Sequence, residues 1–512
     1  MPEWFWSDVP KTAIPDDQEP TEFRFRQAGS VSRGLILFEE KLEELEPIFY
    51  PKSIAVVGSS AHSIKAGSLW VWSLVSAGFP GHIYPVGSRG GRIADLEIFP
   101  SLRMVPGEVD YVIVAIPRQS VLELLDDCAA KNVKAVQFFT AGFSEMDAQE
   151  GRRLEKQMLD KARQGNVRII GPNCIGVYCP EHKIPFLMGT LGESGSVGFV
   201  SQSGGIATKL ATIGIARRIN YSKGVSFGNG IDLDASDFLE YLAADPKTGV
   251  IGAYLEGTRD GARLLRTMKA VAEVKPLVVW KGGRTEAGAQ AALSHTGSLA
   301  RSPAIWSAAL KQAGAIQVHS LEELADTLLV FQQLNSGQGT RAAIIGGLAD
   351  GGGGISVSAA DACMDNGLKV PRLSLETRRE LSRLLGDVGS ILHNPVDVSQ
   401  AQFRGLPALF QAVDSVTSDT AIDVVLIQED MDILLPIYAW KGLEEINEFF
   451  IKLRSRQDKP IIVVLPPGSA EPERLQLEQK LLAASIPVFC SMERAAKAIC
   501  RLNQYACRQG AK

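Results

Sequence analysis

The sequence has no excess of basic residues, no long apolar segment and no N-terminal stretch of the secretory type. Its net charge is -5, so the counterion release that drives nucleic-acid binding has no basic surface to act on. No uninterrupted apolar run approaches the roughly 18 residues of a membrane span. The first residues lack the basic and apolar regions of a signal peptide. We therefore expect a cytoplasmic protein with neither nucleic acid nor a membrane as a partner.

Paired cysteine motifs are also missing. The seven cysteines are scattered, odd in number and never spaced as C-x-x-C, which predicts a reducing compartment and no metal site. The chain has 512 residues, of which 45% are hydrophobic and 22% charged. This composition is typical of a globular protein, and the length predicts about three domains.

From Pro51 onward, short apolar runs of strand length alternate with helical segments. Runs such as SIAVVG, YVIVAIP and VRIIG are separated by stretches such as VLELLDDCAAKN. This βαβ pattern predicts an α/β fold of parallel, doubly wound sheets. A polar, Gly-rich stretch, NSGQGTR, indicates a linker. We expect three domains after an N-terminal segment, which is either a plain extension or a docking arm that contacts a partner. The segments are residues 1–45, 46–180, 190–334 and 341–508.

The first strand of this series ends in a turn that suits a phosphate. Gly58, Ser59 and Ser60 follow the strand and precede a helix, whose N-terminal amides and dipole favour an anion. The spacing is not G-x-G-x-x-G, and the strand HIYPVG ends without the acidic residue that grips an adenosine ribose, so NAD is disfavoured. Ser88 and Arg89 stand there instead, either as donors to a phosphorylated ligand or as a solvated turn.

Six motifs occur along the chain in a fixed order: PKSIAVVGSS, GPNCIGV, SQSGG, YLEG, SHTGSLA and NPVDV. This order resembles that of the α part of ADP-forming acetyl-CoA synthetases, a family similar to the α subunit of succinyl-CoA synthetase. The resemblance covers residues 46–505. It implies a Rossmann-like CoA-binding domain followed by two flavodoxin-like domains. It also implies a subunit of an NDP-forming acyl-CoA synthetase, which interconverts acyl-CoA, NDP and phosphate with an acid, NTP and CoA.

The same resemblance implies that His295, in SHTGSLA, carries a phosphoryl group that arrives through an acyl phosphate. A histidine on a loop is by itself more often a surface residue, although small neighbours here leave room for a phosphate. Glu256, at the end of VIGAYLE, is implied to accept a hydrogen bond from the histidine ring; a solvated strand end is the alternative. The family usually has glycine where this chain has Arg301, a cation beside the proposed phosphohistidine.

Further turns are implied to hold the reacting groups. Asn173 would polarise the acyl carbonyl. A strand-to-helix junction presents unpaired backbone N–H groups to an anion, so the SQSGG turn is expected to hold phosphate, although it is alternatively a plain helix cap. The residues concerned are Ser201, Ser203, Gly204 and Gly205. The expected CoA contacts are Gly58, Ser59, Ser60, Pro85, Ser88, Arg89 and Cys174.

No part of the chain resembles an ATP-grasp domain. The family resemblance therefore implies a separate ATP-grasp β subunit, in a heterotetramer, that supplies ATP or ADP with Mg²⁺. No linear motif specifies the carboxylic acid, because acyl selection depends on pocket shape. Two alternatives stay open, since a shared fold does not fix function. One is a CoA-binding scaffold or regulator without turnover, and the other is a related acyl or carbamoyl transferase.

Overall fold

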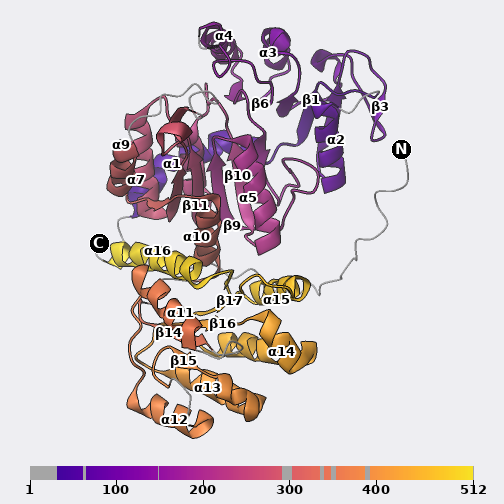
Figure 1. Cartoon of the computed structure of the whole chain (residues 1–512). Coiled ribbons are helices and arrows are strands. Elements are labelled where there is room, and N and C mark those ends of the chain that lie inside the picture. The colour runs from indigo at the N-terminus through magenta and orange to yellow at the C-terminus, as the bar shows by residue number, and fades with distance from the viewer. Residues whose placement is uncertain are drawn as a thin grey trace.

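The computed structural model describes residues 31–61, 65–147, 149–290, 303–334, 339–346, 353–386 and 392–510. Three largely parallel sheets follow one another along this part of the chain, each packed with helices (Figure 1). Their strands are short and almost wholly buried, as expected where helices cover both faces of a sheet. The predicted α/β fold of doubly wound sheets is therefore confirmed.

The first sheet has the strand order β2-β1-β5-β6-β7, with every pairing parallel. Strand β1 precedes both of its neighbours in the chain, so the strand order reverses there and the carboxyl ends open a crevice for a ligand. The strands are β1 (Ser53–Val57), β2 (His82–Val86), β5 (Tyr111–Val114), β6 (Ala135–Phe138) and β7 (Arg168–Ile170), with a small hairpin of β3 (Arg92–Ile93) and β4 (Leu96–Glu97). The helices are α2 (Ala66–Ala77), α3 (Val121–Ala130) and α4 (Glu150–Gln164).

The second sheet has the order β13-β12-β11-β9-β10-β8, in which only β8 is antiparallel. Strand β9 lies between β10 and β11, so the strand order reverses there and again opens a crevice at the carboxyl ends. The strands are β8 (Gly176–Tyr178), β9 (Ser194–Ser201), β10 (Tyr221–Ser226), β11 (Val250–Leu255), β12 (Leu277–Lys281) and β13 (Ile316–Val318). The helices are α5 (Gly204–Arg217), α6 (Ala235–Ala244), α7 (Gly261–Val274), α9 (Pro303–Ala313) and α10 (Leu321–Gln333).

The third sheet repeats this plan with the order β15-β14-β16-β17-β18, all parallel. It is joined to the second domain through α16, which packs along α10 (Figure 1). The strands are β14 (Ala342–Gly346), β15 (Val396–Asp397), β16 (Val424–Gln428), β17 (Ile461–Val464) and β18 (Val488–Phe489). The helices are α11 (Gly353–Asp365), α12 (Leu375–Leu385), α13 (Leu406–Ser418), α14 (Met431–Arg456), α15 (Glu471–Ala483) and α16 (Met492–Gly510).

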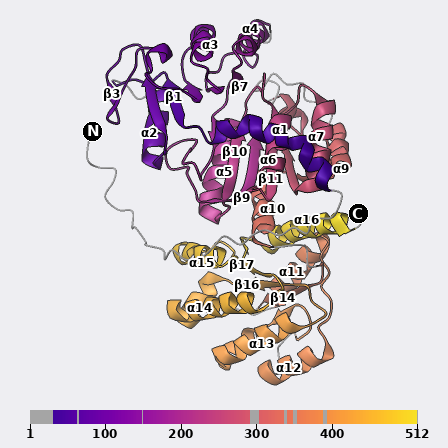
Figure 2. The same cartoon turned by 180° about the vertical axis from the view of Figure 1, so that it is seen from behind.

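The N-terminal extension ends in a helix that packs on the second domain of the same chain. Its last part forms helix α1 (Val31–Phe49), which lies across α6 and α7 of the second domain (Figure 2). Phe49 is 1% exposed and stacks on Tyr241 of α6, and the Tyr241 hydroxyl donates to Glu46. In this part of the extension the buried side chains pack on the second domain of the same chain, and residues 1–30 lie outside the described residues, so a contact of the extension with a partner stays a prediction.

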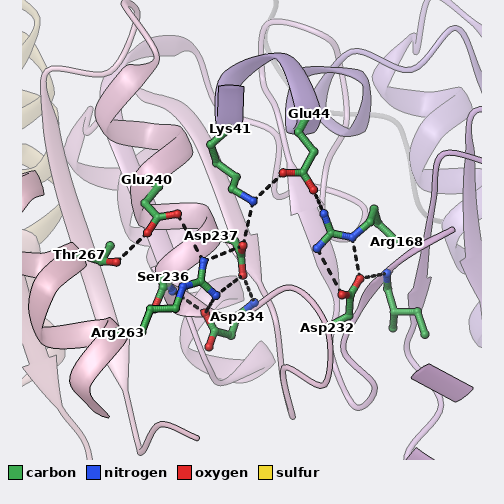
Figure 3. A network of polar contacts seen from close by, with 11 residues as sticks. Lys41, Glu44, Arg168, Asp232, Asp234, Ser236, Asp237, Glu240, Arg263 and Thr267 are labelled. Carbon is green, nitrogen blue, oxygen red and sulfur yellow. Dashed lines mark hydrogen bonds and ion pairs between the residues drawn. The ribbon is translucent and has the colours of Figure 1, made fainter. Parts of the chain in front are cut away.

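A network of charged groups fastens α1 to both the first and second domains (Figure 3). Lys41 of α1 forms an ion pair with Asp237 of α6 at 3.1 Å. One turn further along α1, Glu44 contacts the guanidinium of Arg168, which belongs to the first sheet. Arg168 in turn reaches Asp232 of the second domain. The first two domains are therefore linked by polar contacts that run through Arg168.

Candidate active site

The turn after β1 is built by close backbone packing. The backbone N–H groups of Gly58 and Ser59 both donate to the Val86 carbonyl, at 2.9 and 3.0 Å. Gly58 has φ +106°, a conformation that side chains rarely adopt. A Cβ at Gly67 would lie 2.6 Å from the Gly58 carbonyl carbon, and one at Gly87 would lie 2.1 Å from the Ser59 carbonyl oxygen. The sequence pattern singled out Gly58, whereas Gly67 and Gly87 matter equally because the turn is clamped between them.

The residues that we predict to contact CoA differ in how far a ligand can reach their side chains. Ser59 is 7% exposed and its hydroxyl donates to the Val56 carbonyl at 2.9 Å, so its side chain closes the strand end. Pro85 is buried inside β2, where it pairs with Val56. Ser88 and Arg89, in contrast, are exposed in the turn that follows β2. An exposed Arg89 beside a backbone turn and a helix N-terminus suits a phosphorylated ligand such as CoA.

The GPNC turn after β7 joins the first domain to the second. Asn173 adopts a left-handed conformation, φ 59°, and its N–H donates to the Thr140 carbonyl at 3.1 Å. Its carboxamide makes no hydrogen bond to any residue in the described ranges and is half-buried, so it is free to meet a substrate. A Cβ at Gly228, which follows β10, would lie 2.3 Å from the Asn173 carbonyl oxygen. Asn173 therefore faces the second domain at a contact that admits only glycine.

Cys174 lies beneath this turn rather than on its surface. It is 2% exposed, and its thiol donates weakly to the carbonyls of Phe138 and Ile170, at 3.6 and 3.5 Å. Burial raises its pKa to about 12, so the thiol is neutral and unreactive. The buried, neutral thiol favours a packing role for Cys174 over the expected contact with CoA through sulfur.

The SQSGG turn connects β9 to α5. The Ser201 hydroxyl donates to the Ser203 carbonyl at 2.7 Å, and the Ser203 hydroxyl caps α5 by accepting from the Ile206 N–H at 3.4 Å. Space around Gly205 is open, since a Cβ there would meet nothing closer than 3.8 Å. The first N–H groups of a helix have no intrahelical partners, so Gly204 and Gly205 offer donors to an anion. The turn is therefore a capped helix whose N-terminus is also open, and phosphate binding there stays a prediction.

Gln202 links this turn to Glu256, a role for which the sequence carries no signal. Its side-chain carbonyl accepts from the N–H groups of Glu256 and Gly257, at 2.8 and 3.0 Å. Its own N–H donates to the Tyr254 carbonyl at 3.0 Å. Gln202 is 5% exposed, so these contacts are protected from water. The SQSGG and YLEG turns are therefore fixed side by side at the carboxyl edge of the sheet.

Glu256 is an inward-facing carboxylate, not a solvated strand end. It is 5% exposed, and the Tyr254 hydroxyl donates to its Oε1 at 3.1 Å. Burial and the adjacent Glu256 charge raise the pKa of Tyr254, which keeps that hydroxyl protonated as a donor. A buried carboxylate at the carboxyl end of a parallel strand can orient an imidazole.

His295 and Arg301 lie outside the described residues. The segment that contains them leaves from β12, which ends at Lys281, and returns at α9, which begins at Pro303. Among the described residues, no group of three or more potential metal ligands comes together, and no helix is long and apolar enough to cross a membrane.

Comparisons with known proteins agree with this geometry. Residues 52–180 match the family described as a CoA binding domain, and residues 194–331 match the succinyl-CoA ligase like flavodoxin domain. The α subunit of acetate–CoA ligase [ADP-forming] I of Pyrococcus furiosus is 34% identical over 472 residues, which are 90% of this chain and 98% of that subunit. The chain belongs to the family of ADP-forming acetate–CoA ligase α subunits. The family predicted from the six motifs is thereby confirmed.

Other members of the ADP-forming ligase family extend the comparison. The acetate–CoA ligase [ADP-forming] I of Archaeoglobus fulgidus is 34% identical over 90% of this chain, which spans 64% of that protein's length. The solved structure of the dinucleotide forming acetyl-coenzyme A synthetase 1 of Ca. Korarchaeum cryptofilum, in complex with phosphate and ADP, has a TM-score of 0.78 and 30% identity. That match covers 91% of this chain and 97% of the other. The predicted class, an NDP-forming acid–thiol ligase that binds CoA, is confirmed, and the scaffold alternative is not favoured.

Proposed function

We propose that the chain catalyses the acyl and phosphoryl transfers of an NDP-forming acyl-CoA synthetase, with His295 as the phosphoryl carrier. In the first step, inorganic phosphate attacks the thioester of acyl-CoA, which forms an acyl phosphate and releases the CoA thiol. In the second, a ring nitrogen of His295 attacks phosphorus, which releases the carboxylic acid and leaves a phosphohistidine. In the third, ADP or another NDP accepts the phosphoryl group, which restores His295 and forms the NTP.

Residues of the first and second domains contribute to these steps. The half-buried Asn173 carboxamide is placed to donate to the carbonyl oxygen, where negative charge develops during attack on the acyl group. The N-terminal amides at Gly204 and Gly205 bind the phosphoryl oxygens. Glu256 accepts the N–H of the His295 ring, which fixes the tautomer whose other nitrogen is free to attack. CoA binds at the turn of Gly58 to Ser60, with Ser88 and Arg89 near its phosphates.

The observation that supports this proposal most directly is the contact made by Gln202. Its carbonyl binds the backbone of Glu256 and so brings the acid and the phosphate-binding turn together in a buried position. The proposed mechanism needs both an orienting carboxylate and anion donors for the histidine, and Gln202 holds these two groups together. Neither group alone would support a phosphohistidine.

The third step needs a nucleotide site, which we assign to a partner. Relatives named as subunit alpha imply a partner subunit. We propose an ATP-grasp β subunit that binds ADP or ATP with Mg²⁺, in a heterotetramer with this chain, in the cytoplasm. The names of relatives include acetate and 4-hydroxybutyrate ligases, so small carboxylic acids are the substrate class to test first.

The test uses the full chain, acetyl-CoA and radiolabelled inorganic phosphate. We expect the wild-type protein to acquire an acid-labile, alkali-stable label, as phosphohistidine chemistry requires, and His295→Asn to acquire none. His319→Asn is the matched control, since His319 follows the edge strand β13 and should leave labelling unchanged. A label that persists in His295→Asn would overturn the proposed carrier. CoA binding without any label on the wild type, with a panel of acyl-CoAs, would favour a non-catalytic scaffold.

A further inference from the structure

Lys281 occupies an unusual position for a lysine. It is the last residue of β12, and it pairs with Leu255, the residue before Glu256. Only 6% of it is exposed. Its ammonium donates to the Gly282 carbonyl and lies 5.2 Å from the centroid of the Trp306 ring. The side chain is therefore fixed at the carboxyl edge of the sheet, on the strand next to Glu256.

No carboxylate lies within 4.0 Å of the Lys281 ammonium in the described parts of the chain. Burial lowers the pKa of Lys281, and the charge of Glu256 opposes this only in part. Lys223, which is also buried, has in contrast a direct ion pair with Asp245 at 2.9 Å. A buried ammonium without such a partner is costly, even over an aromatic ring. Lys281 is thus placed to receive an anion that comes with the substrate.

The third domain provides an internal comparison, because strand pairing there follows the same register. Ile251 pairs with Leu277 in the second domain, as Val425 pairs with Ile461 in the third. In each domain a lysine lies two residues before Leu277 or Ile461. Each of these lysines donates to two backbone carbonyls at or just after the end of a helix. The lysines are Lys275, bonded to Leu242 and Asp245 at 2.9 and 2.6 Å, and Lys459, bonded to Thr417 and Asp419 at 2.8 and 2.6 Å. A lysine at this position is therefore a structural feature that the second and third domains share.

Lys281 does not recur in the third domain. Counted from Leu277 and Ile461, its counterpart is Leu465, which is 0% exposed. The same sheet position is thus filled by an apolar side chain where no reaction is expected. The fold therefore does not require a charge at the end of this strand.

We infer that Lys281 is a phosphoryl-binding residue of the ligase, whose ammonium holds the phosphoryl oxygens while the group passes from the acyl phosphate to His295. This rests on the proposed function, since it needs the phosphoryl group to pass the carboxyl edge of β12. The ammonium supplies a point charge and direct hydrogen bonds to the oxygens. It adds to the backbone donors of Gly204 and Gly205, which carry no full charge. Trp306 holds the ammonium in place when no phosphoryl group is bound.

The test compares Lys281→Leu, which copies the side chain of Leu465, with Lys281→Arg and with the control Lys275→Leu. Each full-length protein is incubated with acetyl-CoA and radiolabelled phosphate, and labelling is measured against phosphate concentration. In Lys281→Leu, loss of a charge-assisted contact should raise the phosphate concentration for half-maximal labelling about tenfold or more. Lys281→Arg keeps the charge and should lie between the leucine variant and the wild type. Lys275→Leu should lower thermal stability and leave the phosphate requirement unchanged.

The outcomes separate this inference from the proposed function. An unlabelled wild type counts against the proposed function before any variant is compared. A labelled wild type with the same phosphate requirement in Lys281→Leu overturns the role of Lys281 alone. The affinity of each variant for CoA, measured by calorimetry, must match that of the wild type, because a general loss of the fold would also weaken CoA binding. If Lys281→Leu fails this check, Lys281→Gln replaces it, and an unchanged phosphate requirement in that variant overturns the inference equally.

Discussion

The guanidinium of Arg168 donates to both carboxylate oxygens of Asp232, at 2.8 and 3.3 Å, and so joins the last strand of the first sheet to the second domain. The backbone N–H of Ile169 donates to the same carboxylate at 2.9 Å. Glu44 of α1 contacts the other side of Arg168 (Figure 3). Arg168 begins β7 and Asn173 lies in the turn after that strand, so the pair fixes how this turn meets the second domain.

Arg168→Ala should therefore lower stability and loosen the two domains. The pair is largely shielded from water, so we expect a loss of about 1–3 kcal/mol, the range for hydrogen bonds to charged groups. Arg153→Ala is the control, because its ion pair with Glu150 is exposed and should matter far less. Chemical unfolding of Arg168→Ala, Asp232→Ala and the double variant measures the coupling. Strictly additive effects would contradict a direct interaction.

Gly87→Ala should weaken CoA binding. A Cβ at this position would lie 2.1 Å from the Ser59 carbonyl oxygen, so the phosphate-binding turn must move. We expect the CoA dissociation constant to rise about tenfold or more, which corresponds to about 1.4 kcal/mol. Gly261→Ala is a matched control, since its nearest neighbour would be 3.8 Å away. Isothermal titration with CoA gives both values, and equal affinities would place the ligand elsewhere.

Glu256→Gln should slow phosphorylation of His295 while CoA binding stays unchanged. The amide keeps the size of the side chain but removes the charge that stabilises the ring, so the labelling rate should fall about tenfold or more. Tyr254→Phe removes only the hydrogen bond to Oε1 and should have a smaller effect. Single-turnover labelling with acetyl-CoA and phosphate measures the rates. A Glu256→Gln rate equal to that of the wild type would exclude Glu256 as the orienting group.

Glu429→Gln should stabilise the third domain at alkaline pH. Burial raises the pKa of Glu429 to about 8, against an ordinary value of 4.5, and the Asn447 side chain opposes this only in part. Between these values the unfolded chain is ionised and the folded chain still binds the proton, so stability falls as pH rises. The slope from this group is about 1.4 kcal/mol per pH unit.

The variant should therefore gain more stability over the wild type at pH 8 than at pH 5. Chemical unfolding at the two pH values measures this difference. Glu448→Gln is the control on the same domain, because that carboxylate is half-exposed and pairs only loosely with Lys480. A pH-independent gain in Glu429→Gln would show that the carboxyl is not held protonated.

Local turns of the candidate site could be predicted from the sequence. A glycine followed by serines after an apolar strand indicates a tight turn before a helix, and Gly58 does adopt φ +106° there. Ser203 precedes a helical segment and does cap α5. Such features depend on neighbours along the chain, and sequence patterns report neighbours well. The proposed role of His295 as phosphoryl carrier rests on the order of the motifs and on the family, since a single histidine carries little information.

Other parts of the site were decided only by tertiary structure. Gln202 and Lys281 have no local signal, because their partners lie on strands that are far apart in the sequence. Which strands become neighbours depends on the order and register of the whole sheet, and that places Lys281 opposite Leu255, the residue before Glu256. The same holds for α1, because the helices that cover it, α6 and α7, lie far away from it in the sequence. The sequence by itself therefore determined the elements, the turns and the family of this protein. The packing of the sheets decided which buried charges meet, because burial and pairing are properties of the folded chain.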